Sequence, residues 1–133
     1  MRAILCKEYG PAETLVIEDV TSPVVKGHGV KVRVKAAGLN FPDTLIIEGK
    51  YQLKPTMPFS PGGEMSGEVI EIGEKVTRFK PGDRVAGLTG YGAFAEEVVV
   101  APISSRGKLC WCWVPAAVLA WQRWNWVKPW APM

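Results

Sequence analysis

The sequence predicts a mostly β domain, a β-rich α+β fold arranged as a compact and largely antiparallel barrel. About six short runs rich in Val and Ile are typical of strands, and a single stretch is typical of a helix. The strand and helix patterns do not alternate along the chain as they would in a parallel α/β fold. With 133 residues, the chain has room for one domain, or for one domain and a tail.

The clearest strand covers residues 30–36, where apolar and cationic residues alternate strictly, as expected when one face is buried. Turn residues separate the strands: Pro81 and Gly82 occupy the positions that a type II turn favours, and residues 27–29 mark another reversal. The other predicted strands cover residues 3–7, 15–20, 66–72, 84–88 and 94–100.

One short helix is predicted over residues 42–48. Pro42 suits a first helical position, Asp43 complements the positive end of the helix, and Gly49 can end it.

The end of the chain differs in composition from the rest. All six tryptophans lie between Trp111 and Trp130, and no Asp or Glu occurs after residue 103. Residues 1–103 carry 12 Lys or Arg and 13 Asp or Glu, whereas residues 104–133 carry four cations and no anion. We therefore predict a domain over residues 1–103 and an aberrant, Trp-rich tail over residues 104–133. Neither part has a concentrated basic patch, which argues against a nucleic-acid partner.

The three cysteines cannot form a closed set of disulfides, and the apolar run around Cys6 predicts a buried, reduced thiol. Cys110 and Cys112 have no neighbouring Cys or His pair, so no metal site is predicted. The first residues are too short an apolar run for a signal peptide, and Pro115 interrupts an apolar stretch shorter than the roughly 20 residues that cross a bilayer. These observations predict a cytoplasmic protein without a membrane span.

Four motifs at related spacing carry a resemblance to a known family. They are Met-Arg-Ala at residues 1–3, Lys-Ala-Ala-Gly-Leu-Asn-Phe-Pro-Asp at 35–43, Pro-Gly-Gly-Glu at 61–64 and Phe-Lys-Pro-Gly-Asp-Arg-Val at 79–85. Residues 1 to about 103 resemble the medium-chain dehydrogenase/reductase superfamily. The resemblance implies a GroES-like partial barrel, which in that family is the catalytic domain and precedes a dinucleotide-binding Rossmann domain.

Two positions indicate a branch of that family. Asn40 stands where zinc-dependent members carry a Cys ligand, and Gly63 stands where they carry a His ligand in a Gly-His-Glu motif. Neither an amide nor a hydrogen can replace those ligands. The pattern resembles the zinc-independent, zeta-crystallin-like quinone oxidoreductases, which pass hydride from NADPH to quinones or activated enones.

The resemblance implies a set of site residues. Asn40 and Tyr51 would be the catalytic residues in the cleft, and Asn40, Asp43, Gly62 and Gly63 would contact the cofactor. Asn40 offers a hydrogen-bond donor and an acceptor, and the Tyr51 hydroxyl can protonate an enolate-like product. The two glycines would allow close approach of the cofactor, or permit a positive φ, or both.

Each of these residues also has a structural interpretation. Asn40 can cap the predicted helix, Tyr51 can be an amphipathic surface ring, and Asp43 is better explained as a first-turn helix residue. Glu64 can equally be structural, and His28 is best explained as an ordinary turn residue.

The tail lacks the glycine-rich turn that binds pyrophosphate in the family's cofactor domain, because Gly107 is the last glycine. The codons can, however, be read in another frame, in which the last base of each codon is combined with the first two bases of the next. In that frame, residues 110–114 encode Leu-Val-Leu-Gly and residues 124–127 encode Glu-Leu-Gly. These fit the first strand and helix of that domain. Our hypothesis is that the chain is out of frame from about Ser104, after loss of an intervening segment. The alternatives are a true C-terminal element packed on the barrel, or an interfacial anchor.

The resulting prediction is the catalytic domain of an NADPH-dependent quinone oxidoreductase, shortened and inactive by itself, without stable NADP(H) binding. One alternative is a non-enzymatic binding or regulatory module, or a subunit that pairs with a full-length relative. Another is an enoyl or acryloyl-type reductase domain. Apolar surface exposed by loss of the cofactor domain also predicts self-association.

Overall fold

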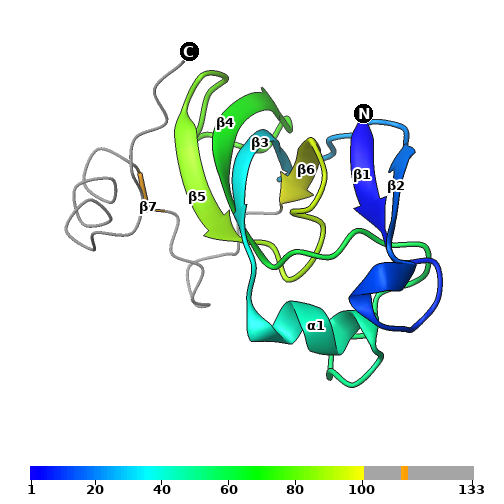
Figure 1. Cartoon of the computed structure of the whole chain (residues 1–133). Coiled ribbons are helices and arrows are strands. Elements are labelled where there is room, and N and C mark those ends of the chain that lie inside the picture. Colours follow the sequence, from blue (N-terminus) through cyan, green and yellow to red (C-terminus); the bar gives the residue numbers. More distant parts are fainter. Residues whose placement is uncertain (101–111, 114–133) are drawn as a thin grey trace, which may run out of the picture.

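The computed structural model describes residues 1–100 and the strand Cys112–Trp113. Its elements, in chain order, are β1 (Arg2–Leu5), a 3-10 turn (Ala12–Thr14), β2 (Val16–Asp19), β3 (Val30–Gly38), α1 (Phe41–Ile47), β4 (Glu64–Ile72), β5 (Arg84–Leu88), β6 (Glu97–Val100) and β7 (Cys112–Trp113) (Figure 1). The predicted strands and helix therefore exist, with no end displaced by more than three residues. The hypotheses about residues 104–111 and 114–133 lie outside the described residues.

All strand pairs in the described part of the chain are antiparallel. One sheet has the order β6-β3-β4-β5-β7, and β1 pairs with β2 in a separate hairpin (Figure 1). The hairpin joins the larger sheet through a bridge between Ala3 and Ala95. The prediction of a mostly β, antiparallel fold is confirmed.

The strict alternation in β3 does not translate into strict alternation of burial. Its pairing with β4 shifts register twice, between Lys31 and Val32 and between Val34 and Ala36. Lys31, which the pattern places on the open face, is only 9% exposed, and its Nζ lies 2.7 Å from Oε2 of Glu71. The register shifts twist the strand, and the ion pair makes burial of the ammonium group tolerable.

Both predicted turns are present. Gly82 has φ of 93°, and the Asp83 N–H donates to the Lys80 carbonyl at 3.1 Å. That is the conformation for which a type II turn needs glycine at its third position. At the other turn, the Gly29 N–H donates to the Lys26 carbonyl at 2.8 Å.

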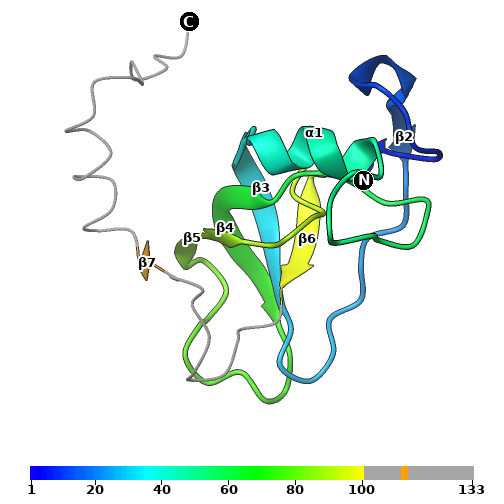
Figure 2. The ribbon, with the colours of Figure 1, turned by 90° about the horizontal axis from the view of Figure 1, so that it is seen from below.

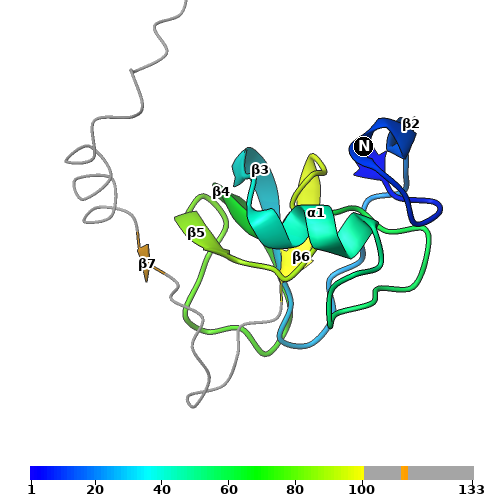
Figure 3. The same cartoon turned by 60° about the horizontal axis from the view of Figure 1, so that its bottom comes forward.

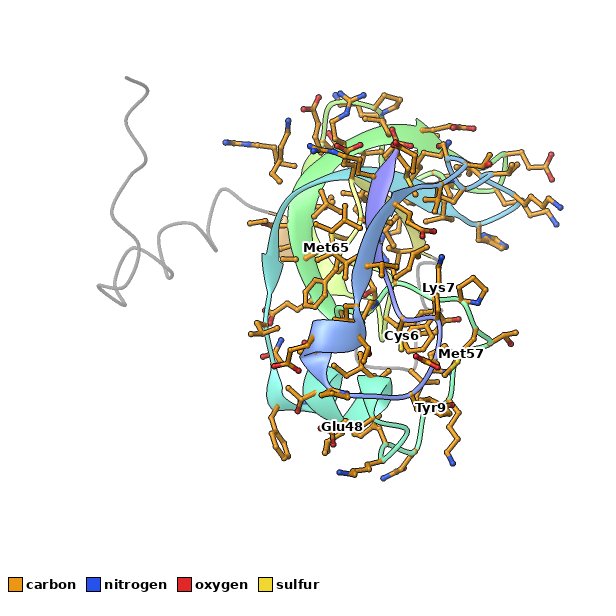
Figure 4. The ribbon with its side chains drawn as sticks, turned by 45° about the vertical axis from the view of Figure 1, so that its right-hand side comes forward. Cys6, Lys7, Tyr9, Glu48, Met57 and Met65 are labelled. Carbon is orange, nitrogen blue, oxygen red and sulfur yellow. The ribbon has the colours of Figure 1, made fainter. Side chains whose placement is uncertain are left out.

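Two separate apolar clusters hold the fold together. The larger lies within the sheet and consists of Val30, Val32, Met65, Val69, Val85, Ala93, Val98 and Val100. The smaller joins the end of β1 to α1 and consists of Cys6, Ile46, Ile47 and Phe59. Figure 4 shows Met65 inside the sheet, with Cys6 and Met57 together at a distance from it. Cys6 is buried as predicted, and its burial raises the pKa of the thiol.

Helix α1 lies across one end of the larger sheet (Figures 2 and 3). Its buried residues are Asp43, Ile46 and Ile47, which share one face at helical spacing. The two isoleucines belong to the smaller cluster, and Asp43 is the charged residue on this buried face of α1. This helix positions the polar residues at the sheet end.

Candidate functional site

Three strands of the larger sheet have neighbouring ends, at the end of the sheet where α1 lies (Figure 2). The last residue of β3, Gly38, pairs with the first residue of β4, Glu64, which pairs with the last residue of β5, Leu88. The segments that continue from these ends carry Asn40 and Gly63. Four of the residues predicted for the site, Asn40, Asp43, Gly62 and Gly63, therefore lie at one end of the sheet.

Asp43 is buried, and both of its carboxylate oxygens accept hydrogen bonds from backbone groups. Oδ2 accepts the N–H of Asn40 at 2.8 Å, which is the Asp43 half of a capping box, and Oδ1 accepts the N–H of Gly63 at 3.0 Å. Asp43 is only 3% exposed. Asp43 thus ties the start of α1 to the segment before β4, and the geometry supports the structural interpretation.

Asn40 is the N-cap residue of α1, as its structural interpretation predicted. The Asp43 N–H donates to the backbone carbonyl of Asn40 at 2.9 Å. The side-chain amide also contacts the sheet, because Nδ2 donates to Oε2 of Glu64 at 3.0 Å. Asn40 and Glu64 are exposed, so this amide and carboxylate form a polar pair open to a ligand.

The two glycines have different surroundings. Gly62 is buried with φ of 95°, and a Cβ there would lie 2.8 Å from the backbone nitrogen of Phe94. Gly63 is half-buried without a positive φ, and a Cβ there would find its nearest neighbours at 3.6 Å. The fold itself therefore requires glycine at position 62 but not at position 63. Any need for glycine at position 63 would come from a molecule that approaches it.

Tyr51 follows the C-terminal end of α1, and its ring is partly buried against the smaller apolar cluster. Two residues further on, the Leu53 side chain lies near Gly90, and the Gly90 carbonyl lies near Gly63. The chain after Tyr51 therefore returns toward the glycine pair, and the role of Tyr51 stays a prediction.

Exposed apolar side chains surround the Asn40–Glu64 pair. We call Leu39, Phe41 and Leu88 the apolar rim; they are 77%, 74% and 52% exposed. Leu39 and Phe41 flank Asn40 in sequence, and Leu88 pairs with Glu64 across β5 and β4. A polar pair between exposed apolar residues is typical of a surface that contacts a ligand or another part of a protein.

In the described part of the chain, no group of three or more His, Cys, Asp or Glu residues is placed to hold a metal ion. His28 lies in the turn after Lys26, as its structural interpretation expected. No helix among the described residues has the length and apolar content that crossing a membrane requires.

Sequence reasoning missed Thr89, which fixes the path of the glycine pair. Its hydroxyl donates to the Gly62 carbonyl at 3.0 Å, and its N–H donates to the Gly63 carbonyl at 2.8 Å. The only signal in the sequence was its place directly after a predicted strand. The contact of Glu64 with Asn40 was missed too, because their separation of 24 residues hides it.

Comparison with known proteins identifies the class. The family model for the alcohol dehydrogenase GroES-like domain matches residues 26–105, and the chain belongs to that family. Its structural neighbours are members of the medium-chain dehydrogenase/reductase superfamily, which confirms the resemblance.

Several similar proteins are named quinone oxidoreductase or quinone oxidoreductase-like protein. The chain is 47% identical to quinone oxidoreductase-like protein 2 of Bos taurus over 98 residues, covering 74% of this chain and 28% of that protein. It is 41% identical to the quinone oxidoreductase of Lama guanicoe over 103 residues, covering 76% of this chain and 31% of that protein. The Escherichia coli quinone oxidoreductase complexed with NADPH superimposes with a TM-score of 0.75 at 30% identity, covering 88% and 34% of the two chains. The chain thus spans about a third or less of these proteins.

Proposed function

We propose that this chain supplies the GroES-like catalytic domain of a zinc-independent, NADPH-dependent quinone oxidoreductase. The observation that carries the proposal is the Asn40 amide, which is bonded to Glu64 at the sheet end and flanked in sequence by the exposed Leu39 and Phe41. An amide between apolar groups fits the carboxamide and flat ring of nicotinamide. The relatives named quinone oxidoreductase, one of them complexed with NADPH, support this assignment.

The residues of the site would have distinct roles. Asn40 would orient the nicotinamide or the substrate carbonyl, and Gly63 would admit the ring close to the backbone. Asp43 would act indirectly, by holding Asn40 and Gly63 in place through their N–H groups. NADPH would supply the hydride when bound. Tyr51 would donate a proton to the reduced acceptor.

The described residues fit the nicotinamide end of the cofactor better than its pyrophosphate end. The described part of the chain contains no glycine-rich turn between a strand and a helix. We therefore propose that the chain by itself binds NADP(H) weakly and transfers hydride slowly. We also propose that the catalytic domain ends near residue 103, and that the tail contributes to it only the strand Cys112–Trp113, which pairs with β5. A cytoplasmic location belongs to the same proposal.

Nicotinamide mononucleotide tests the site, because it carries the nicotinamide end without the adenosine half. In an NMR titration of the labelled chain, we expect shifts of the backbone signals of residues 38–41 and 63. Asn40→Ala should weaken these shifts, and Ile17→Ala, on the exposed hairpin, should leave them unchanged. An absence of shifts at millimolar ligand, or shifts confined to other regions, would show the assignment to be wrong.

An activity measurement tests the statement about the whole chain. With NADPH and a quinone, we expect little or no turnover above the uncatalysed rate, whereas a full-length relative should turn over under the same conditions. Turnover at a rate near that of the relative would contradict the proposal.

The apolar rim favours a second candidate, a non-enzymatic module that pairs with another chain. Its occupant would be the cofactor domain of a full-length relative. Co-purification of the chain with such a relative, lost in a Phe41→Ser variant, would support this function.

A further inference from the structure

We propose that Glu64 is a positioning residue for Asn40: its carboxylate fixes the direction in which the Asn40 amide faces a bound nicotinamide or carbonyl group. The inference rests on the proposed function for its ligand, but its structural part concerns these two side chains alone. No sequence motif singles out this role, because the motif that contains Glu64 is explained equally well by a place in the strand.

The contact itself determines the orientation of the amide. An ionised carboxylate only accepts hydrogen bonds, so the group that faces it must be the NH2 end of Asn40 and not its oxygen. Nδ2 of Asn40 donates to Oε2 of Glu64 at 3.0 Å. A bond to a charged acceptor is stronger than one between neutral groups, so it resists rotation of the amide.

The backbone of Asn40 is held separately. Its N–H donates to Asp43 at 2.8 Å, and its carbonyl accepts the Asp43 N–H at 2.9 Å. With the backbone tied to α1 and the NH2 group tied to β4, the side chain cannot turn without breaking a bond. The capping box directs the Asn40 side chain toward the Asp43 backbone as well. The second N–H of the amide then faces in a fixed direction, as donation to a carbonyl or carboxamide oxygen requires.

Gly38 provides the space that this carboxylate occupies. It pairs with Glu64 across β3 and β4, and a Cβ there would lie 2.8 Å from Oε2 of Glu64 and 3.5 Å from Nδ2 of Asn40. The nearest atom is the end of a flexible side chain, so alanine at position 38 would displace the carboxylate rather than the backbone. Gly38 therefore offers a way to break the contact without changing either partner.

The experiment follows the side-chain NH2 signals of Asn40 by NMR, assigned by their loss in Asn40→Asp. In the unmodified chain we expect two well-separated proton signals with slowed solvent exchange. Glu64→Gln keeps an acceptor of the same shape and should preserve them. Glu64→Ala and Gly38→Ala should bring the two signals together and speed exchange, whereas Glu74→Ala, in an exposed loop, should not.

The ligand readout is the affinity for nicotinamide mononucleotide. The lost contact should weaken binding of the mononucleotide about fivefold in Glu64→Ala and Gly38→Ala, which corresponds to the net contribution of one hydrogen bond. Glu64→Gln should restore the affinity. Thermal unfolding of each variant checks that the fold is intact; if Glu64→Ala does not fold, Gly38→Ala provides the same test.

The two proposals fail in different ways. Unchanged Asn40 signals in both Glu64→Ala and Gly38→Ala would overturn the positioning role, whatever the ligand does. Altered Asn40 signals with unchanged affinity for the mononucleotide would also overturn it. Absence of mononucleotide binding by the unmodified chain would instead overturn the proposed function.

Discussion

A buried carboxylate at the start of α1 holds two backbone segments together. Asp43 accepts N–H groups from Asn40 and Gly63, and no other acidic residue in the described part of the chain is buried to the same degree. Asp43→Ala removes both acceptors and leaves two N–H groups without partners, so we expect it to lower the free energy of unfolding by roughly 2–4 kcal/mol.

Urea unfolding measures that loss, and amide exchange locates it. The N–H groups of Asn40 and Gly63 should exchange faster in Asp43→Ala than in the unmodified chain. Asp43→Asn, which keeps one side-chain oxygen, should lower the free energy of unfolding by less than Asp43→Ala does. Equal stability of all three proteins would mean that the two bonds contribute nothing to the fold.

The adjacent glycines provide a matched pair of substitutions. Gly62→Ala would force a side chain into a φ of 95° and within 2.8 Å of the Phe94 backbone, so we expect a loss of about 2 kcal/mol or more. Gly63→Ala meets only ordinary contacts, so we expect a change of about 0.5 kcal/mol or less. Chemical unfolding of the two variants distinguishes them. If Gly63→Ala proves as destabilising as Gly62→Ala, the fold and not a ligand would require glycine at position 63.

At the level of elements, β1 is fastened to the segment before β6 through Glu96. The carboxylate accepts the backbone N–H of Arg2 at 2.9 Å and its Nε–H at 3.2 Å. These two bonds, the backbone one foremost, hold the pKa of Glu96 below its usual 4.5. A lowered pKa in the folded state means that the stabilisation is present above pH 4.5 and is lost as the pH falls through the lower value.

We therefore expect the N-terminal hairpin to loosen in acid before the rest of the sheet. Hydrogen exchange of the Arg2 amide should accelerate below pH 4.5 more than that of Val69 in the core, after correction for intrinsic rates. The effect should be small, because the pair is exposed. In Glu96→Gln, the additional acceleration of Arg2 exchange below pH 4.5 should disappear. If this acceleration persists, another titrating group is responsible for it.

The elements were predictable where a local pattern determines them. Residues 84–88 have the bounds of β5 as predicted, and the turn at Gly82 follows from Pro and Gly at fixed positions. The burial of Lys31 was not predictable, because its ion pair with Glu71 joins residues 40 apart in sequence. The site divides in the same way: capping by Asn40 is local in sequence, whereas its bond to Glu64 requires the tertiary fold.

At the scale of the molecule, the polar pair and the apolar rim share one end of the sheet, while the Tyr51 ring packs against the smaller apolar cluster. The chain spans about a third or less of its relatives. The apolar rim is exposed among the described residues, so a second copy of the chain can contact it. This gives a physical basis for the predicted self-association.

Sedimentation velocity at several concentrations tests this explanation. We expect the unmodified chain to show concentration-dependent association, and the double variant Leu39→Ser/Phe41→Ser to shift it toward monomer, because two side chains that are 77% and 74% exposed lose their apolar area. Ile17→Ser removes a side chain of similar exposure, 71%, from β2 and should have no effect. If Ile17→Ser reduces association as strongly as the double variant, general surface hydrophobicity would be the cause. If only the double variant does so, the sheet end that carries Asn40 is the interface, and a bound nicotinamide would have to compete with it.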